Sequence, residues 1–525
     1  MIESDLNSDN TINNNSGYTQ SLWMEIHLPS FSSLEQDLNA DVCIVGAGIV
    51  GLTCAYTLAK QGKSVVVLDQ GAIAGGQTAR TTAHLSWVLD DRYFDIEKLF
   101  DEERARLAAE SHAAAIDYIE KIVLEEKIEC DFERVDGYLF VPPEDSTDVL
   151  DKEFNAIQKI GMELNKAKRA PFSSFDTGPC LQFPRQAQFH ILKYLQGLIQ
   201  VLLKMGVKIF NDTHVNHFEE DTLCLVKTQS GLSVTAQSVI VATCTPINDR
   251  FFIHTKQAAY RTYVIAAAIP QGSVPKGLYW DTLDPYHYIR IQKNSSDPHL
   301  DWLIIGGEDH KTGQDSDIEA KYTLLEAWSR VRFPMINKID YRWSGQVFEP
   351  IDSLAFIGRN PGNKNVYIAT GDSGNGMTHG TIAGILIPDL ILGKDNPWKS
   401  LYEPSRKTLK AASEFIHENL NTLLQYKDWL TSGEIKTIEA LGPEEGAILR
   451  EGLKKIAVYK DEQHKIHVNS AFCPHLGGCL RWNSGEKSWD CPLHGSRFNG
   501  CGHVITGPAI NNLYPQSYKE VLNKE

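Results

Sequence analysis

The stretch DVCIVGAGIVGLTCAYTLAKQGKSVVVLDQ, residues 41–70, predicts a strand, a glycine turn, a helix and a second strand. Val42–Val45 is short, apolar and rich in β-branched residues, as expected of a buried parallel strand. A helical pattern then runs to Lys60, Gly62 ends it, and Ser64–Leu68 is the next buried strand. This order predicts an α/β unit of the Rossmann type.

The glycines of this turn have the spacing of a dinucleotide-binding fingerprint. Gly46 permits the tight turn, Gly48 lets the backbone approach a pyrophosphate, and Gly51 lets the helix pack on the strand. Asp69 follows at the end of the second strand, where its carboxylate can accept hydrogen bonds from ribose hydroxyls. A purely structural glycine turn is the alternative, but the strand–helix context favours a dinucleotide site.

Two later strands, 238–243 and 365–370, return to the same sheet, and the second leads into the glycine-rich turn ATGDSGNGMT, residues 369–378. Such a turn brings backbone and a helix N-terminus close to a flat or anionic group, as the edge of a flavin requires. Because only one fingerprint is present, FAD is favoured over NAD. The other predicted cofactor contacts are Gly76, Thr78, Thr81, Thr82, His84, Thr243, Gly371, Gly374, Gly376, Met377 and Thr378.

Over about residues 38–400 these elements resemble the D-amino-acid-oxidase-like FAD superfamily, which includes DadA-like and glycine-oxidase-like proteins. The resemblance implies a Rossmann-type FAD domain interleaved with an antiparallel sheet that holds the substrate. His84 has two interpretations. It either carries the flavin covalently, as a histidine does in some flavoenzymes, or positions it, and we expect the second.

A different motif, C-x-H-x15-C-x2-H, lies near the C-terminus and consists of Cys473, His475, Cys491 and His494. One Cys–His pair on each of two loops suits a two-iron cluster, with both cysteines on one iron and both histidines on the other. A Cys2His2 zinc site is the alternative, although zinc fingers favour C-x2-C with H-x3-H. The sequence therefore predicts a Rieske [2Fe–2S] cluster.

Residues 445–515 resemble Rieske domains further, since Gly507-Pro508-Ala509 matches the proline loop that covers the cluster. Rieske proteins of respiratory complexes carry an additional cysteine in each loop, and the two form a disulfide. Here Leu493 stands at the second of these positions, opposite Cys479. The resemblance is therefore to soluble, disulfide-free Rieske modules of reducing compartments.

The segment DTLDPYHYIRI places Tyr286, Tyr288 and Arg290 on one side of a strand. Two phenols and a guanidinium there either line a substrate pocket or belong to an ordinary half-buried strand. In amino-acid-oxidising relatives an arginine precedes an Asp in the stretch that matches WSGQVFEPIDSLAFIG. Gln346 holds that place here, so the carboxylate clamp is missing. Tyr288, Arg290 and Gln346 are the predicted catalytic residues.

The whole pattern resembles a bacterial family of DadA-like flavoproteins with C-terminal Rieske domains. We expect a disordered lead-in (1–37), the FAD domain (38–405) with its substrate region at about 130–180 and 250–350, a helical connector (406–431) and a small all-β Rieske domain (432–525). A net charge of −16 and no long apolar run argue against a nucleic-acid surface, a signal peptide and a membrane span. We expect a cytoplasmic protein.

Three functions fit this domain pair. The preferred one is an FAD-dependent dehydrogenase that oxidises a small amine or amino acid and passes electrons through the cluster to a one-electron carrier, such as a ferredoxin-like protein or a quinone. The alternatives are an electron-transfer module between protein partners and a redox sensor. A substrate-sized pocket lined by Tyr288 and Arg290 would favour the dehydrogenase.

Overall fold

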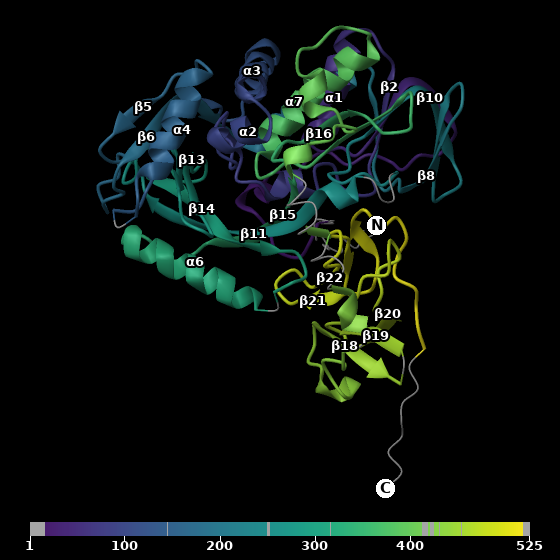
Figure 1. Ribbon diagram of the computed structural model, residues 1–525. Coiled ribbons are helices and arrows are strands. Elements are labelled where there is room, and N and C mark those ends of the chain that lie inside the picture. Colours follow the sequence, from purple (N-terminus) through teal and green to yellow (C-terminus); the bar gives the residue numbers. More distant parts are fainter. Residues whose placement is uncertain are drawn as a thin grey trace, which may run out of the picture.

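The chain folds into a large N-terminal domain built on two sheets and a small C-terminal domain of β-strands, drawn in yellow and yellow-green at the bottom of Figure 1. The computed structural model describes residues 16–143, 145–248, 253–315, 317–411, 418–419, 425–429, 431–452 and 454–517. Among these residues no helix is long and apolar enough to cross a membrane.

The first sheet has the order β16-β17-β10-β1-β2-β7, with β9 beside β10 and β8 beside β9. The pairs of β1 with β2 and β10, of β10 with β17 and of β2 with β7 are parallel, as the buried apolar strands predict. Its strands are β1 (Leu38–Val45), β2 (Val65–Leu68), β7 (Lys208–Phe210), β8 (Val215–Glu220), β9 (Cys224–Thr228), β10 (Ser233–Val241), β16 (Phe356–Arg359) and β17 (Val366–Thr370).

Alternate residues of β1 enter different cores. Val42 and Ile44 pack with the helices, whereas Cys43 and Val45 pack on the opposite face, where the β8–β9 hairpin lies. Burial on both faces explains why β1 reads as a continuous apolar run. The helices are α1 (Ile49–Lys60), α2 (Tyr93–Leu99), α3 (Glu102–Glu126), α4 (Asp148–Lys159), α5 (Ile191–Lys204), α6 (Ile318–Arg332), α7 (Gly376–Ile391) and α8 (Lys399–Tyr402).

The second sheet has the order β15-β11-β14-β13-β12-β4-β6-β3, with β5 beside β6, and α6 covers its outer face (Figure 1). Its pairs are antiparallel except for β12 with β4. The predicted antiparallel layer is thereby confirmed. Its strands are β3 (His84–Leu85), β4 (Glu133–Phe140), β5 (Asn165–Ala167), β6 (Cys180–Gln188), β11 (Gln257–Pro270), β12 (Leu278–Asp281), β13 (Tyr288–Lys293), β14 (Leu300–Lys311) and β15 (Tyr341–Pro350).

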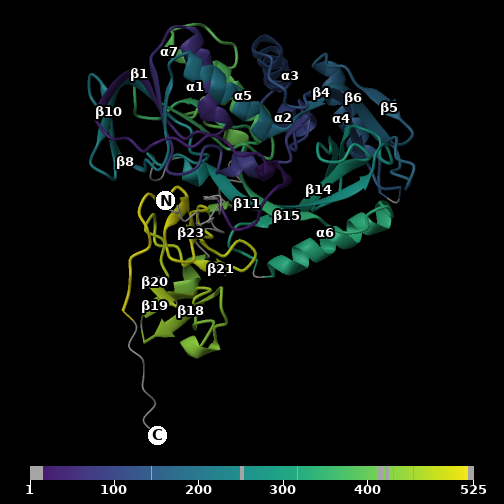
Figure 2. The same ribbon diagram turned by 180° about the vertical axis from the view of Figure 1, so that it is seen from behind.

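The C-terminal domain contains a three-stranded and a four-stranded antiparallel sheet. Figure 2 shows the four-stranded sheet next to β11 and β15 of the large domain, while the three-stranded sheet lies farther away. The first comprises β18 (Glu445–Glu451), β19 (Lys454–Lys460) and β20 (Ile466–Ser470), and the second β21 (Arg481–Asn483), β22 (Ser488–Asp490), β23 (Arg497–Asn499) and β24 (Val504–Thr506).

The predicted disordered lead-in is wrong for residues 16–37. Trp23 is fully buried, its indole N–H donates to the carbonyl of Thr81 at 2.6 Å, and its ring lies 5.4 Å from the guanidinium of Arg290. The contacts of this one large side chain order a segment whose polar composition alone suggests disorder. Residues 1–15 lie outside the described residues.

The predicted helical connector, residues 406–431, lies mostly outside the described residues, which include only the short 3-10 turns Leu409–Ala411 and Tyr426–Trp429 there. The domain boundaries at residues 405 and 432 stay predictions.

Candidate functional site

The glycine turn between β1 and α1 is as close-packed as its sequence suggests. Gly46 has φ +107°, and a Cβ atom there would lie 2.4 Å from the carbonyl oxygen of Ala242. A Cβ atom on Gly51 would lie 1.9 Å from the carbonyl oxygen of Gly46, and one on Gly48 would lie 2.8 Å from Oγ1 of Thr78. Because no larger side chain fits at these three positions, the backbone stays open to a phosphate group.

Asp69 ends β2 beside this turn. Its Oδ2 accepts a hydrogen bond from the backbone N–H of Ala47 at 2.7 Å, and its Oδ1 accepts one from Gly71 at 3.0 Å. Burial raises the pKa of Asp69 to about 6 against the opposing effect of these two hydrogen bonds. The carboxylate therefore holds the turn in shape and also lines the adjoining cavity.

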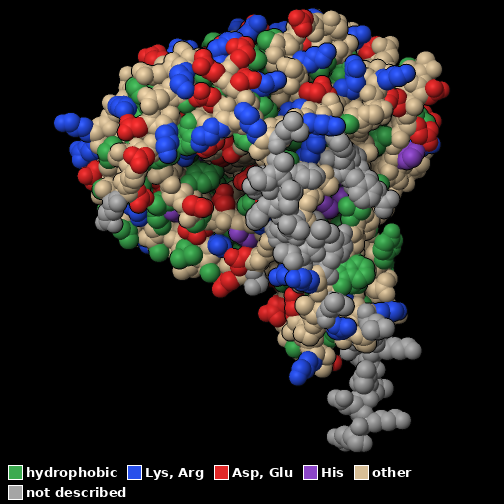
Figure 3. Space-filling model, viewed as in Figure 1, with side chains coloured by type: hydrophobic (Ala, Val, Ile, Leu, Met, Phe, Trp, Pro, Cys, Tyr) green, Lys and Arg blue, Asp and Glu red, His purple; other side chains and the backbone are tan. Residues whose placement is uncertain are grey.

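One cavity runs from this turn to the antiparallel sheet, and Figure 3 shows a hollow beside the grey residues where acidic side chains gather. All but three of the predicted cofactor contacts line it. Of these three, Gly51 packs against the backbone of Gly46, and Gly371 packs against the ring of Pro350. The hydroxyl of Thr378 hydrogen-bonds the ring of His112. The predicted cofactor contacts that do line the cavity are Gly46, Gly48, Asp69, Gly76, Thr78, Thr81, Thr82, His84, Thr243, Gly374, Gly376 and Met377.

Two of the three predicted catalytic residues reach the cavity. Tyr288 lines the cavity, and its hydroxyl group forms a hydrogen bond with the hydroxyl group of Thr262 at 2.6 Å. Gln346 lines it as well, and its Nε2 donates to the carbonyl of Gly495 in the C-terminal domain at 2.9 Å. The third prediction, Arg290, is not borne out by its position.

The structure buries Arg290 behind the cavity wall. Its Nη1 donates to the carbonyls of Thr82 and Ala83 at 2.9 and 2.8 Å, and it does not line the cavity. Strand alternation places Arg290 on the expected face, but a long side chain there reaches past the cavity to backbone oxygens. In this position Arg290 supports the backbone next to His84, and its role as a catalytic residue stays a prediction.

The four predicted cluster ligands come together on two loops of the C-terminal domain. The Cys473 N–H donates to the carbonyl of Gly478, and the Cys491 N–H donates to that of Ser496, each at 2.9 Å. The rings of His475 and His494 have centroids 5.2 Å apart, and all four ligands are buried. Nδ1 of His494 has no hydrogen-bond partner, as expected of a nitrogen reserved for iron.

The rest of the loop region also fits a cluster without a disulfide. All ten cysteines lie within the described residues and none forms a disulfide; Cys479 and Leu493 are both buried. The backbone N–H of Ala509, in the predicted proline loop, donates to Oγ of Ser496 at 3.0 Å. In the described part of the chain no three His, Cys, Asp or Glu side chains are placed to hold a single metal ion.

The contribution of the C-terminal domain to the cavity wall is not predicted by any sequence pattern. Residues 505–507, 509 and 510 line the cavity together with the N-terminal domain. The ring of His214 bonds the carbonyl of Ile510 at 2.9 Å, whereas the side chain of His217 is exposed. The ring of His254 lies 5.1 Å from that of His475 and 6.0 Å from that of His494.

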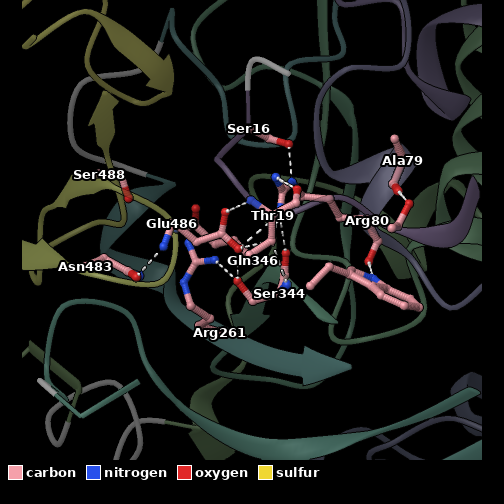
Figure 4. A network of polar contacts seen from close by, with 12 residues as sticks. Ser16, Thr19, Ala79, Arg80, Arg261, Ser344, Gln346, Asn483, Glu486 and Ser488 are labelled. Carbon is pink, nitrogen blue, oxygen red and sulfur yellow. Dashed lines mark hydrogen bonds and ion pairs between the residues drawn. The ribbon is translucent and has the colours of Figure 1, made fainter. Parts of the chain in front are cut away.

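A buried network of charges joins the two domains (Figure 4). Arg80 Nη1 lies 3.1 Å from Glu486 Oε1, Arg497 Nε lies 3.0 Å from Asp490 Oδ1, and Arg261 Nη2 lies 3.7 Å from Asp490 Oδ2. Burial opposes ionisation of Glu486, but the three arginines outweigh it and hold its pKa below the usual range. The Arg80–Glu486 and Arg261–Asp490 pairs therefore connect the two domains through buried side chains.

A dinucleotide turn and a two-loop Cys2His2 site on one chain define an oxidoreductase that combines FAD with a Rieske [2Fe–2S] cluster. The chain belongs to the DAO family of FAD dependent oxidoreductases, whose family model matches residues 41–390, and the Rieske [2Fe-2S] domain model matches residues 423–519.

Known proteins resemble the whole chain or its larger part. YhfW of Bacillus subtilis, described as a Rieske 2Fe-2S iron-sulfur protein, is 32% identical over 93% of this chain and 95% of its own. The γ-glutamylputrescine oxidoreductase of Escherichia coli is 26% identical over 69% of this chain and 86% of its own. Glycine oxidase from Geobacillus kaustophilus has the same fold, with a TM-score of 0.60, 17% identity, and coverage of 70% and 99%.

Proposed function

We propose that this oxidoreductase dehydrogenates a small amine or amino acid in the cavity and delivers the electrons through the Rieske cluster to an external one-electron carrier. The carrier would be a ferredoxin-like protein or a quinone. The observation that carries the proposal is the shared cavity wall, to which the C-terminal domain contributes residues 505–510 except Pro508. Two domains with unrelated tasks would have no reason to enclose the same cavity.

A continuous set of contacts leads from the cavity to the cluster ligands. Thr243 and Cys244 line the cavity, and the neighbouring Thr245 side chain lies 3.4 Å from Nδ1 of His254. The His254 ring in turn packs on the rings of both cluster histidines. FAD accepts electrons in pairs and releases them singly, and a [2Fe–2S] cluster takes one at a time. This packing therefore supports internal electron transfer without any movement of the domains.

The substrate side of the proposal rests on the cavity and on the relatives. One relative carries a γ-glutamylputrescine oxidoreductase activity in its name and another is a glycine oxidase, so an amine or amino acid is the class of substrate that fits. Tyr288 and Gln346 would orient the substrate, and buried aromatic residues would exclude water. Burial lowers the pKa of His84 to about 3, so its ring stays neutral and acts as a polar contact.

The His475→Cys variant tests the proposed electron path. Substrate-driven bleaching of the flavin under anaerobic conditions should be retained, because His475 does not line the cavity and the substitution leaves the lining residues of both domains unchanged. Reduction of a ferredoxin or quinone should be abolished or greatly slowed, because the cluster is lost or its potential is lowered.

His503→Cys is the matched control, since it makes the same replacement in the same domain at a histidine that is exposed and is not one of the four predicted ligands. It should leave both reactions unchanged. Transfer to the carrier at the wild-type rate in His475→Cys would show that the cluster takes no part in turnover, and this function would be wrong.

A further inference from the structure

The part of the cavity beside the antiparallel sheet and the second glycine-rich turn, residues 369–378, is strongly acidic. Asp90 follows β3, Asp309 lies on β14, Glu349 lies on β15, and Asp372 lies in the turn before α7; all four line the cavity. Among the lysines and arginines of the described ranges, Arg80 alone lines it, and its guanidinium is paired with Glu486. The cavity therefore offers several carboxyl groups to a ligand and no available positive charge.

These carboxylates are close enough to affect one another. Burial raises the pKa of Asp90 to about 6, and the neighbouring Asp91 and Asp372 add to the shift against a hydrogen bond from Tyr286. Burial likewise raises the pKa of Asp309 to about 7, with a further contribution from Asp90. Burial and the neighbouring carboxylates therefore disfavour the ionised form of each group, and a bound cation would stabilise that ionised form.

Two acceptor atoms in the wall lack a donor. Gln346 is 1% exposed, and its Oε1 has no hydrogen-bond partner. Its orientation is determined, because the other end of the amide donates to the carbonyl of Gly495. Oδ1 of Asp309 is also buried without a partner. A ligand that carries N–H groups would satisfy both atoms.

Aromatic rings complete this end of the cavity. Trp280, Tyr286 and Tyr288 line it, with the two tyrosine rings 5.6 Å apart and the ring of His84 5.9 Å from that of Tyr288. The faces of such rings attract an ammonium group and pack against methylene carbons. Carboxylates and aromatic faces together are typical of a site for an organic cation.

A substrate carboxylate would find no partner here. The guanidinium of Arg290 does not line the cavity, since its Nη1 bonds backbone carbonyls and its Nη2 bonds Gln292 behind the wall, and Gln346 cannot neutralise a charge. We propose that the cavity recognises its substrate as an aliphatic ammonium cation without a carboxylate on the reacting carbon, held by Asp309, Gln346 and the tyrosines. This inference narrows the proposed function, and so it rests on that function.

The test compares ligands that differ only in one carboxylate. Butylamine is compared with norvaline, and putrescine with ornithine, by anaerobic titration of the holoenzyme followed by flavin absorbance. Tetramethylammonium is included because it binds as a cation and has no proton to lose. We expect each amine to bind at least about tenfold more tightly than its amino acid, since a buried carboxylate without a partner is strongly disfavoured.

Asp309→Asn removes one charge at nearly constant shape and should weaken amine and tetramethylammonium binding by about tenfold to a hundredfold. Glu308→Gln is the control, because Glu308 adjoins Asp309 on β14 but does not line the cavity. It should leave binding unchanged. The FAD content of each variant confirms that the fold is intact.

The outcomes separate this inference from the proposed function. Amino acids that bind as tightly as the amines, or amine affinities that Asp309→Asn leaves unchanged, would overturn the cation site even if the flavin were reduced. Spectral binding of amines and tetramethylammonium without any flavin reduction would support the cation site and overturn the dehydrogenase function.

Discussion

Glu486 is the side chain on which the junction between the domains depends most directly. It lies in the turn between β21 and β22, is 2% exposed, and accepts hydrogen bonds from Arg80 and Ser344 of the N-terminal domain. The network around it contains three guanidinium groups and two carboxylates (Figure 4). Glu486→Gln keeps the size and one acceptor oxygen but leaves Asp490 alone opposite three positive charges.

Removing one member of a buried ion pair typically costs about 3–5 kcal/mol, because the remaining charge is left in a dry environment. The corresponding change in an exposed pair costs about 0–1 kcal/mol. Glu133→Gln provides this comparison, since Glu133 pairs with Lys276 at 2.7 Å while 39% of its side chain is exposed. We therefore expect Glu486→Gln to lose several times as much unfolding free energy as Glu133→Gln.

Urea unfolding of the holoenzyme measures the difference when flavin fluorescence reports one domain and the visible circular dichroism of the cluster reports the other. The midpoint of the cluster signal should fall most. In the double variant Arg80→Met, Glu486→Leu the loss should be smaller than the sum of the two single losses, because both charges are removed together. Equal midpoints for Glu486→Gln and Glu133→Gln, or additive single losses, would refute this account of the junction.

Four further changes have defined outcomes. Asp69→Ala should weaken FAD retention by about tenfold to a hundredfold, because a charged acceptor at the glycine turn is lost; unchanged FAD content after long dialysis would contradict this. Cys479→Ser should keep the Rieske signal in electron paramagnetic resonance at nearly the same potential, since Leu493 leaves no disulfide to break. His254→Phe preserves ring packing on His475 but removes polar nitrogens, so the midpoint potential of the cluster should shift while FAD absorbance stays constant. Tetramethylammonium affinity should rise between about pH 5 and 8, because Asp309, with its pKa raised to about 7, is neutral in acid and charged above that pH; a flat profile would show that Asp309 does not face the ligand.

The large-scale architecture could be predicted because each part has a local signal. The apolar strand, Gly46, Gly48 and Gly51 specify the Rossmann unit, and the structure confirms it in the parallel pairing of β1 with β2. The cluster motif is equally local, since two short loops supply all of its ligands. These predictions depended on spacing and turn geometry, which do not change when distant segments pack around them.

The predictions that failed depended on where a long side chain ends. Alternation correctly put Arg290 on the inner face of its strand, but only the packed structure shows that its guanidinium bonds the carbonyls of Thr82 and Ala83. The lead-in differs for another reason: its polar composition predicts disorder, whereas the burial of a single indole, that of Trp23, orders residues 16–37. The junction around Arg80 and Glu486 joins residues 406 positions apart, and no short pattern reveals such a pair.

Because both domains contribute to one cavity, cofactor binding and domain docking are linked. His214 and Gln70 on the N-terminal side bond the carbonyls of Ile510 and Ile505, at the end of the cavity that contains Asp69. A ligand that fills this end stabilises the docked arrangement, and docking equally stabilises the bound ligand, since a coupling free energy acts in both directions. The same contacts hold Gly495, next to the cluster ligand His494, against Gln346 of the cavity wall. Together with the buried Arg80–Glu486 pair, these contacts place both domains around one cavity, and a shared site is a physical reason for joining the two domains in one chain.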